Sequence, residues 1–246
     1  KIAQWLGESG WNVDVINALS YTDAEMVRRR GPVKRKRDGT GKFFKQRVET
    51  PVALAGISRR YSRYGIDRDL LEKRIRDANP DVVFISTGMT YWYPGVQEVS
   101  QVVKSHSQGT PIIAGGIYAT LLPDHCQETG GVDHVIAGEP WLKLGALLNN
   151  LGYPAAGTTT EAEMCGGSTE RKKARKGTEP AVRPRVQPLI TGKTVREAWI
   201  DAGVLQLNRG CPFACSYCAS KKLYHGFSPG EPEKAFADLQ SFSRLG

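Results

Sequence analysis

The chain of 246 residues lacks any apolar run long enough to cross a membrane, and its first residues lack the pattern of a secretory signal peptide. Its five cysteines are too few and too unevenly spaced for a disulfide framework, and no internal repeat is present. These absences exclude membrane-spanning, disulfide-stapled and repeat architectures. They predict a cytoplasmic protein in a reducing compartment, with no membrane partner.

Positive charge is concentrated in one segment. Residues 28–47 hold ten Lys or Arg against a single acid, Asp38, whereas the rest of the chain is balanced, so this segment accounts for the whole net charge of +9. Such runs are commonly exposed and solvated, which is the favoured interpretation of the basic loop at residues 28–50. Nucleic acid is the alternative partner, because Phe43 and Phe44 lie among the basic residues and aromatic rings stack on bases.

Apolar runs alternate with helical patterns through the first two-thirds of the chain, which is the order expected of a parallel sheet covered by helices. Asp67 is a candidate N-cap for a helix that must end before Pro80. We therefore predict an α/β fold with a doubly wound, Rossmann-like parallel sheet. The expected strands are residues 13–16, 81–87, 111–116 and 132–138, and the expected helices are 1–9, 67–79, 95–104, 123–128 and 139–151.

Small and hydroxylic residues follow three of these strands. In open parallel sheets, ligands bind beyond the carboxyl ends of the strands, and small residues let backbone amides approach a bulky ligand. This edge is therefore the predicted cofactor site. Its candidate contacts are Ser86, Thr87, Gly88, Met89, Thr90, Gly115, Gly116, Tyr118, Gly138 and Glu139.

Cys211, Cys215 and Cys218 lie together near the C-terminal end, directly after an apolar run. Three thiolates on one loop can hold three irons of a cubane cluster and leave the fourth iron open to a small ligand, because such clusters otherwise take four cysteines. A structural zinc site with His225 as fourth ligand is the alternative. Cys126 and Cys165 stand alone and are interpreted as free thiols.

The Cys-x3-Cys-x2-Cys spacing, with Tyr217 before the last cysteine, resembles the signature of the radical S-adenosylmethionine (radical SAM) enzymes. The resemblance implies a 4Fe–4S cluster on the three cysteines, S-adenosylmethionine on the open iron, and cleavage to a 5′-deoxyadenosyl radical. It also implies that Tyr217 lies near the adenine and that a small flavodoxin- or ferredoxin-type protein supplies electrons. Arg209 either offsets part of the cluster's negative charge or is an ordinary surface residue.

The upstream region resembles the cobalamin-binding domain that precedes the radical SAM barrel in many bacterial and archaeal enzymes. The pattern is Gly-Gly-Ile-Tyr-Ala-Thr at residues 115–120 with Gly138-Glu139, and residues 89–95 resemble an uncharacterised subgroup of that class. The resemblance implies that residues 86–90 and 115–118 cradle cobalamin, which then serves as a methyl carrier. It names no substrate and no catalytic residue.

Two features depart from the family pattern. No Asp-x-His-x-x-Gly motif is present, so the resemblance implies cobalamin bound without a protein histidine on cobalt. The opening strand of such a domain is expected before Lys1, and the later barrel strands after Gly246, so we expect a fragment of a longer enzyme.

The predicted organisation is a cobalamin-binding-like Rossmann domain at residues 1–151, a linker at 152–198, and the start of a radical SAM (β/α) partial barrel at 199–246. The last part should contain a strand at 201–207 and a helix at 231–245. The predicted function is that of a radical SAM enzyme with cobalamin as methyl carrier. The alternatives are a radical SAM RNA-modifying enzyme, such as a methylthiotransferase, and a non-catalytic zinc-bearing nucleic-acid-binding module.

Overall fold

The computed structural model describes residues 2–34, 36, 41–58, 60–153, 207–224 and 226–244. The chain divides into two compact units, one of residues 16–138 with 190–246 and the other of residues 1–15 with 139–189. Within the described part of the chain, no helix combines the length and apolarity needed to cross a bilayer.

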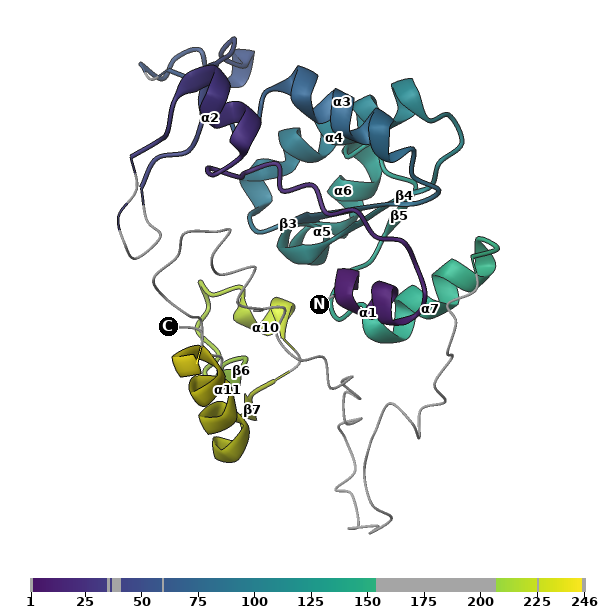
Figure 1. Cartoon of the computed structure of the whole chain (residues 1–246). Helices are drawn as coiled ribbons and strands as arrows, with labels where there is room; N and C mark the ends of the chain where they lie inside the picture. Colours follow the sequence, from purple (N-terminus) through teal and green to yellow (C-terminus); the bar gives the residue numbers. More distant parts are fainter. Residues whose placement is uncertain are drawn as a thin grey trace. The chain divides into compact units, whose positions relative to one another are not determined.

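A three-stranded parallel sheet forms the centre of the first unit (Figure 1). Its strands are β3 (Val83–Thr87), β4 (Ile112–Gly115) and β5 (His134–Val135), in that order. Val83 pairs with Ile112, and Ile113 pairs with His134. The strands predicted at 81–87 and 111–116 are confirmed, whereas the one predicted at 132–138 is shortened to two residues.

Helices α3 (Arg68–Ala78), α4 (Tyr93–His106) and α6 (Pro123–Thr129) lie on one side of this sheet (Figure 1). Residues Leu70, Leu71 and Ile75 of α3 are buried at helical spacing, so the apolar stripe of that helix faces the core. Helices α3, α4 and α6 confirm the sequence prediction. A short helix, α5 (Gly116–Leu121), was not predicted, because its glycine-rich start is atypical of helices.

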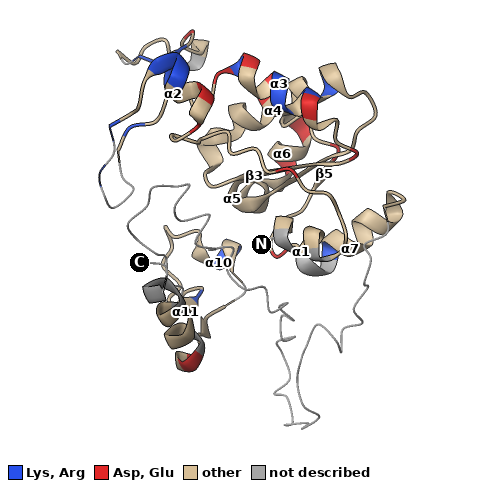
Figure 2. Ribbon diagram, viewed as in Figure 1, with Lys and Arg blue, Asp and Glu red and all other residues tan. Residues whose placement is uncertain are grey.

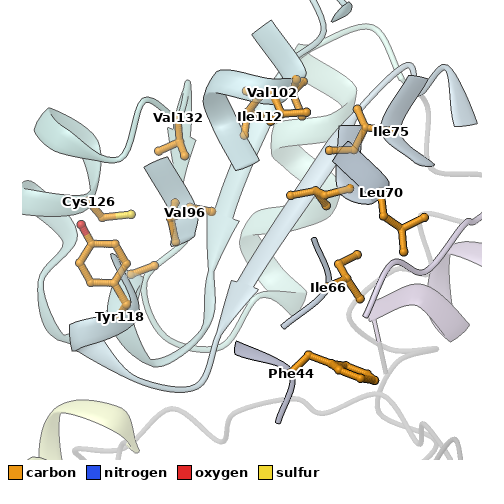
Figure 3. Packing of buried hydrophobic residues seen from close by; sticks show 14 of the residues in the cluster. Phe44, Ile66, Leu70, Ile75, Val96, Val102, Ile112, Tyr118, Cys126 and Val132 are labelled. Carbon is orange, nitrogen blue, oxygen red and sulfur yellow. The ribbon is translucent and has the colours of Figure 1, made fainter. Parts of the chain in front are cut away.

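The buried core joins these helices to β4 (Figure 3). Ile112 and Ala114 of the central strand are buried, since this strand has a neighbour on each side. The cluster also takes Tyr118 from α5 and Cys126 from α6. This packing fixes the ends of the three strands, and therefore the predicted cofactor edge, in place.

The basic segment contains more structure than a solvated loop. Helix α2 (Ala24–Arg30) occupies its start. Further along, β1 (Lys45–Arg47) pairs with β2 (Ser62–Tyr64) as an antiparallel ribbon. The short turn η1 (Val52–Leu54) lies in the connection between these two strands. Figure 2 shows basic residues on α2 in blue and acidic residues on α3 in red. Arg29 is 2.6 Å from Asp69, and Arg30 is 2.6 Å from Asp67.

One local prediction is wrong, and another is confirmed in position only. Residues 13–16 form no strand, and Val15 is 75% exposed. Within the described residues, no other strand lies beside this segment to supply the hydrogen bonds that a strand needs. Asp67 occupies the N-cap position of α3, but its side chain makes no capping hydrogen bond. Its carboxylate pairs with Arg30 instead, which joins α2 to α3.

Asp23 should contribute to stability in a pH-dependent way. It caps α2 by accepting hydrogen bonds from the backbone N–H groups of Glu25 and Met26, each at 3.1 Å, and it pairs with Arg74. Burial alone would raise the pKa of Asp23, but the Met26 N–H bond and Arg74 together hold that pKa below its ordinary value. A carboxylate with a lowered folded-state pKa stabilises the fold above its unfolded pKa, and that contribution is lost as pH falls through the folded value.

We expect Asp23→Ala to lower the free energy of unfolding by about 1–2 kcal/mol at neutral pH, as loss of an N-cap does. Asp23→Asn keeps the cap but loses the charge facing Arg74, so it should cost less. Urea unfolding at several pH values checks this. The difference between wild type and Asp23→Ala should shrink below about pH 4; a difference that stays constant down to pH 2 would contradict the assignment.

The second unit contains α1 (Ile2–Glu8) and α7 (Trp141–Asn150), both predicted. Leu144 and Leu148 of α7 are buried at helical spacing. The rings of Trp11 and Tyr153 lie 6.0 Å apart, centroid to centroid, so the residues that follow these helices are in contact.

The C-terminal residues 207–244 form a short antiparallel pair, β6 (Asn208–Arg209) and β7 (Ser228–Pro229), with helices α10 (Ser220–Leu223) and α11 (Pro232–Arg244). Helix α11 confirms the helix predicted at 231–245. The strand predicted at 201–207 lies outside the described residues except for Leu207, and so does almost all of the predicted linker.

Candidate functional site

The carboxyl ends of β3 and β4 meet at the predicted cofactor edge. Thr87 and Gly116 form an isolated parallel bridge one residue beyond the regular ladder. The segments that follow β3 and β4, here called the exit segments of these strands, therefore begin side by side. Ser86 and Gly88 are exposed, and the Thr87 hydroxyl donates to the Met89 carbonyl oxygen at 3.2 Å. The structure therefore brings the first two groups of predicted contacts together.

Glycine is required at one of these positions and leaves space at the other. Gly116 has φ +89°, and a Cβ there would lie 2.6 Å from the Thr87 carbonyl oxygen and 2.9 Å from the Ser86 hydroxyl. At Gly115 a Cβ would meet only the Ile136 carbonyl oxygen, at 3.9 Å. Gly116 therefore allows the β4 exit to approach β3, while Gly115 keeps the edge open.

Thr120 connects the segment that follows β5 to the edge. Its hydroxyl donates to the Gly116 carbonyl oxygen at 2.8 Å and accepts from the Gly138 N–H at 3.0 Å. Gly138 has φ +82°, which favours glycine. Sequence reasoning did not select Thr120, although its place four residues after Gly116 on a helix is the signal that could have found it. Glu139, which the sequence also predicted as a cofactor contact, belongs to the other compact unit.

An aromatic surface follows β3. Residues 90–92 form the turn η2 (Thr90–Trp92), and the exposed fractions of Met89, Tyr91 and Trp92 are 44%, 67% and 39%. Tyr91 and Trp92 contact each other edge to face at 6.1 Å. Exposed aromatic side chains grouped beside a polar, glycine-rich edge are typical of a ligand surface.

Tyr118 has a different position from the one expected of a cofactor contact. Its side chain is 1% exposed and packs in the core, where Figure 3 shows the hydroxyl directed toward the Cys126 sulfur. The hydroxyl lies 2.8 Å from Nδ1 of His125, and the His125 ring packs edge-on against Tyr93 at 5.1 Å. Burial raises the pKa of both Tyr118 and Cys126.

The structure places His125 of α6 in a cluster with Tyr93, Tyr118 and Thr129. Because Nδ1 is already engaged by Tyr118, the cluster orients the imidazole within the fold. Tyr118 belongs to α5 and His125 to α6, so no single helical periodicity in the sequence links the two residues.

The three cysteines of the C-terminal region lie on the loop between β6 and α10. Gly210 begins that loop with φ +80°, and a Cβ there would be 1.9 Å from the Gly226 carbonyl oxygen, so only glycine allows the close approach. Cys211 is half-buried, whereas Cys215 and Cys218 are exposed, and the Cys218 N–H donates to the Cys215 carbonyl oxygen at 3.1 Å.

Hydrogen bonds on this loop lower the pKa of one of the three thiols. The Cys218 sulfur lies 3.2 Å from the Ser220 hydroxyl oxygen, and hydrogen bonds from that hydroxyl and from the Ser220 N–H lower the pKa of the Cys218 thiol. The thiolate is the form that binds metal. Arg209, a candidate for offsetting cluster charge, lies over the Tyr224 ring at 5.1 Å, and Tyr217 is 90% exposed.

Within the described ranges, no three His, Cys, Asp or Glu side chains are gathered as a metal site, so the cysteines are near in sequence without converging. His225, the alternative zinc ligand, lies outside the described residues. The donor set, three thiols on one accessible loop, fits iron–sulfur chemistry. The cluster assignment therefore remains a prediction from the sequence.

Comparison with known proteins bears on the upstream region. Residues 48–147 match the family model of the B12 binding domain, which agrees with the Rossmann-like fold and the parallel sheet. A protein of Pyrococcus horikoshii named as an uncharacterised methyltransferase is 25% identical over 171 residues. The alignment covers 63% of this chain and 36% of that protein, so the chain spans about a third of its relative. No solved structure matches the chain.

Proposed function

We propose that this chain is part of a cobalamin-dependent radical SAM enzyme that transfers a methyl group to a substrate not yet identified. The observation that carries the proposal is the match of residues 48–147 to the B12 binding domain, since this range includes the whole open edge described above. The name of the distant relative supports methyl transfer. The cysteine spacing supports the radical SAM part.

The edge fits cobalamin by its shape and chemistry. Gly115 and Gly116 carry no side chain where the β4 exit meets β3, so backbone N–H groups of this exit can reach the amide side chains of the corrin ring. Ser86 and Thr87 add hydroxyl groups at the same edge, and Tyr91 and Trp92 add exposed aromatic area. When bound, cobalamin would supply a methyl carrier.

Cobalamin would be held at this edge without a protein histidine on the cobalt. The Asp-x-His-x-x-Gly motif is absent, and His125 Nδ1 is held by the Tyr118 hydroxyl. The Tyr93–Tyr118–His125 cluster instead supports the aromatic surface from behind, because Tyr93 directly follows η2 and packs on His125.

Cys211, Cys215 and Cys218 are the proposed ligands of the 4Fe–4S cluster. The cluster and S-adenosylmethionine would together supply a carbon radical by one-electron reduction. The chain's own contribution is to place three thiols on one loop, to favour thiolate at Cys218 through Ser220, and to fix the loop's start at Gly210. A small flavodoxin- or ferredoxin-type protein is the proposed electron donor.

Cobalamin binding tests the edge independently of the cysteines. We expect the chain to retain hydroxocobalamin through gel filtration, measured by corrin absorbance. Gly115→Leu should abolish this retention, because the added side chain would occupy the ligand edge. Tm should change little, since a Cβ at Gly115 meets only the Ile136 carbonyl oxygen, at an ordinary contact distance of 3.9 Å.

Gly56→Leu is the matched control, since Gly56 is exposed in the turn after η1, a Cβ there meets nothing within 4 Å, and the position lies outside the segments that follow the strands. It should bind as wild type does. Equal retention by Gly115→Leu and wild type would show that cobalamin does not occupy this edge.

A further inference from the structure

The ribbon of β1 and β2 has two chemically different faces. Lys45 lies directly opposite Tyr64, and Arg47 directly opposite Ser62. Opposed residues of an antiparallel pair share a face, and alternate residues of one strand share a face. Lys45, Arg47 and Tyr64 therefore lie on one side of the ribbon, and Gln46 and Arg63 on the other.

Arg63 attaches the ribbon to the rest of its unit. Its Nε lies 2.7 Å from a Glu98 carboxylate oxygen of α4, with both side chains 18% exposed, and its guanidinium also donates to the Ile66 carbonyl oxygen. The Gly65 N–H donates to the Phe44 carbonyl oxygen at 2.9 Å, next to the ribbon. The side opposite Arg63 is consequently left to solvent, and Tyr64 is 55% exposed.

Positive charge on the exposed side has no ion-pair partner among the residues that the structure describes. Arg29 and Arg30 of α2 pair with acids of α3 or its N-cap. The basic residues of the ribbon and its surroundings behave differently: they are exposed, and none has an ion pair with another described residue. These are Lys34, Lys36, Lys45, Arg47 and Arg60.

We propose that this surface, the basic ribbon face of Lys45, Arg47 and Tyr64, binds single-stranded nucleic acid. Unpaired cations neutralise backbone phosphates and release counterions. The exposed ring of Tyr64, directly opposite Lys45, can stack on an unpaired base, as in sequence-tolerant single-strand binding surfaces. A duplex hides its base faces, so Tyr64 favours single strands. The inference involves neither the cobalamin edge nor the cysteines, so it stands or falls separately from the proposed function.

Fluorescence anisotropy of a labelled oligouridylate of about 12 nucleotides, titrated with the full chain at about 50 and about 200 mM salt, tests the proposal. We expect affinity to fall as salt rises. Lys45→Gln/Arg47→Gln should weaken binding by about tenfold or more and reduce the slope of log affinity against log salt by about 1.4, since two phosphate contacts are lost on a single strand.

Tyr64→Leu should weaken binding at least about fivefold, because it removes one base stack. Tyr64→Phe keeps the ring and should bind as wild type does. Both changes are at an exposed site, and an unchanged Tm verifies that the fold is intact.

The matched charge control is Lys73→Gln/Arg76→Gln, which removes the same two charges from α3, outside the basic ribbon face. It should keep wild-type affinity. The proposal is overturned if both double variants weaken binding equally, which would indicate net charge alone. It is also overturned if Tyr64→Leu binds normally, or if polyglutamate displaces the oligouridylate at matched charge concentration, which would indicate an acidic polypeptide as the occupant.

Discussion

Cys215→Ala is expected to abolish assembly of an iron–sulfur cluster and to leave the unit built on the three-stranded sheet folded. Two thiols on the loop cannot hold a cubane whose fourth iron already lacks a protein ligand. Iron after anaerobic reconstitution should therefore fall from about four per chain to less than about one. Cys215 is exposed and packs in no core, so circular dichroism should be unchanged.

Cys165→Ala is the matched control, because it makes the same chemical change at a cysteine outside the 211–218 motif. It should retain a full complement of iron. If Cys215→Ala retained as much iron as Cys165→Ala, the three-cysteine ligand set would be wrong.

Gly116→Ala should strongly destabilise the fold at the cofactor edge. The new Cβ would lie 2.6 Å from the Thr87 carbonyl oxygen, a backbone atom that cannot move without disturbing β3, and φ at this position is +89°. Overpacking and left-handed strain together should cost about 3 kcal/mol. For a chain of this size that corresponds to a drop in Tm of about 6–12 °C.

Gly95→Ala provides the comparison within the same unit. Gly95 lies in α4, and a Cβ at this position would meet no atom within 4 Å. Alanine there should therefore raise the free energy of unfolding by about 0.5 kcal/mol, because its helix propensity is higher than that of glycine. Thermal unfolding followed by circular dichroism measures both changes. Equal Tm values for Gly116→Ala and Gly95→Ala would contradict the close contact between β3 and the β4 exit.

The sequence predicted the parts of the fold in which burial and periodicity agree. The β-branched runs of β3 and β4 and the apolar stripe of α3 have one low-energy arrangement, with the strands buried and the stripe on the core. The alternation at Val13 and Val15 resembled a strand but has no partner, and hydrogen bonding to a neighbour is decided by the tertiary structure. The short polar strands β1 and β2 have no apolar alternation to reveal them.

The candidate site was predictable in its place but not in its contacts. Strand ends followed by glycines located the edge, because parallel strands present their carboxyl ends together. The burial of Tyr118 against His125 depends on how α5 and α6 pack, which no motif encodes. The charge of residues 28–47 was evident, but its division into ion-paired arginines of α2 and an exposed ribbon required the structure.

The measurement that tests the central claim most directly is EPR of the anaerobically reconstituted and reduced chain, with and without S-adenosylmethionine, alongside metal analysis. A 4Fe–4S cluster on the three cysteines predicts about four irons per chain. Binding of S-adenosylmethionine to the open iron predicts a cluster signal that shifts when S-adenosylmethionine is added. Stoichiometric zinc with no cluster signal would contradict the account and identify Cys211, Cys215 and Cys218 as ligands of a structural zinc ion.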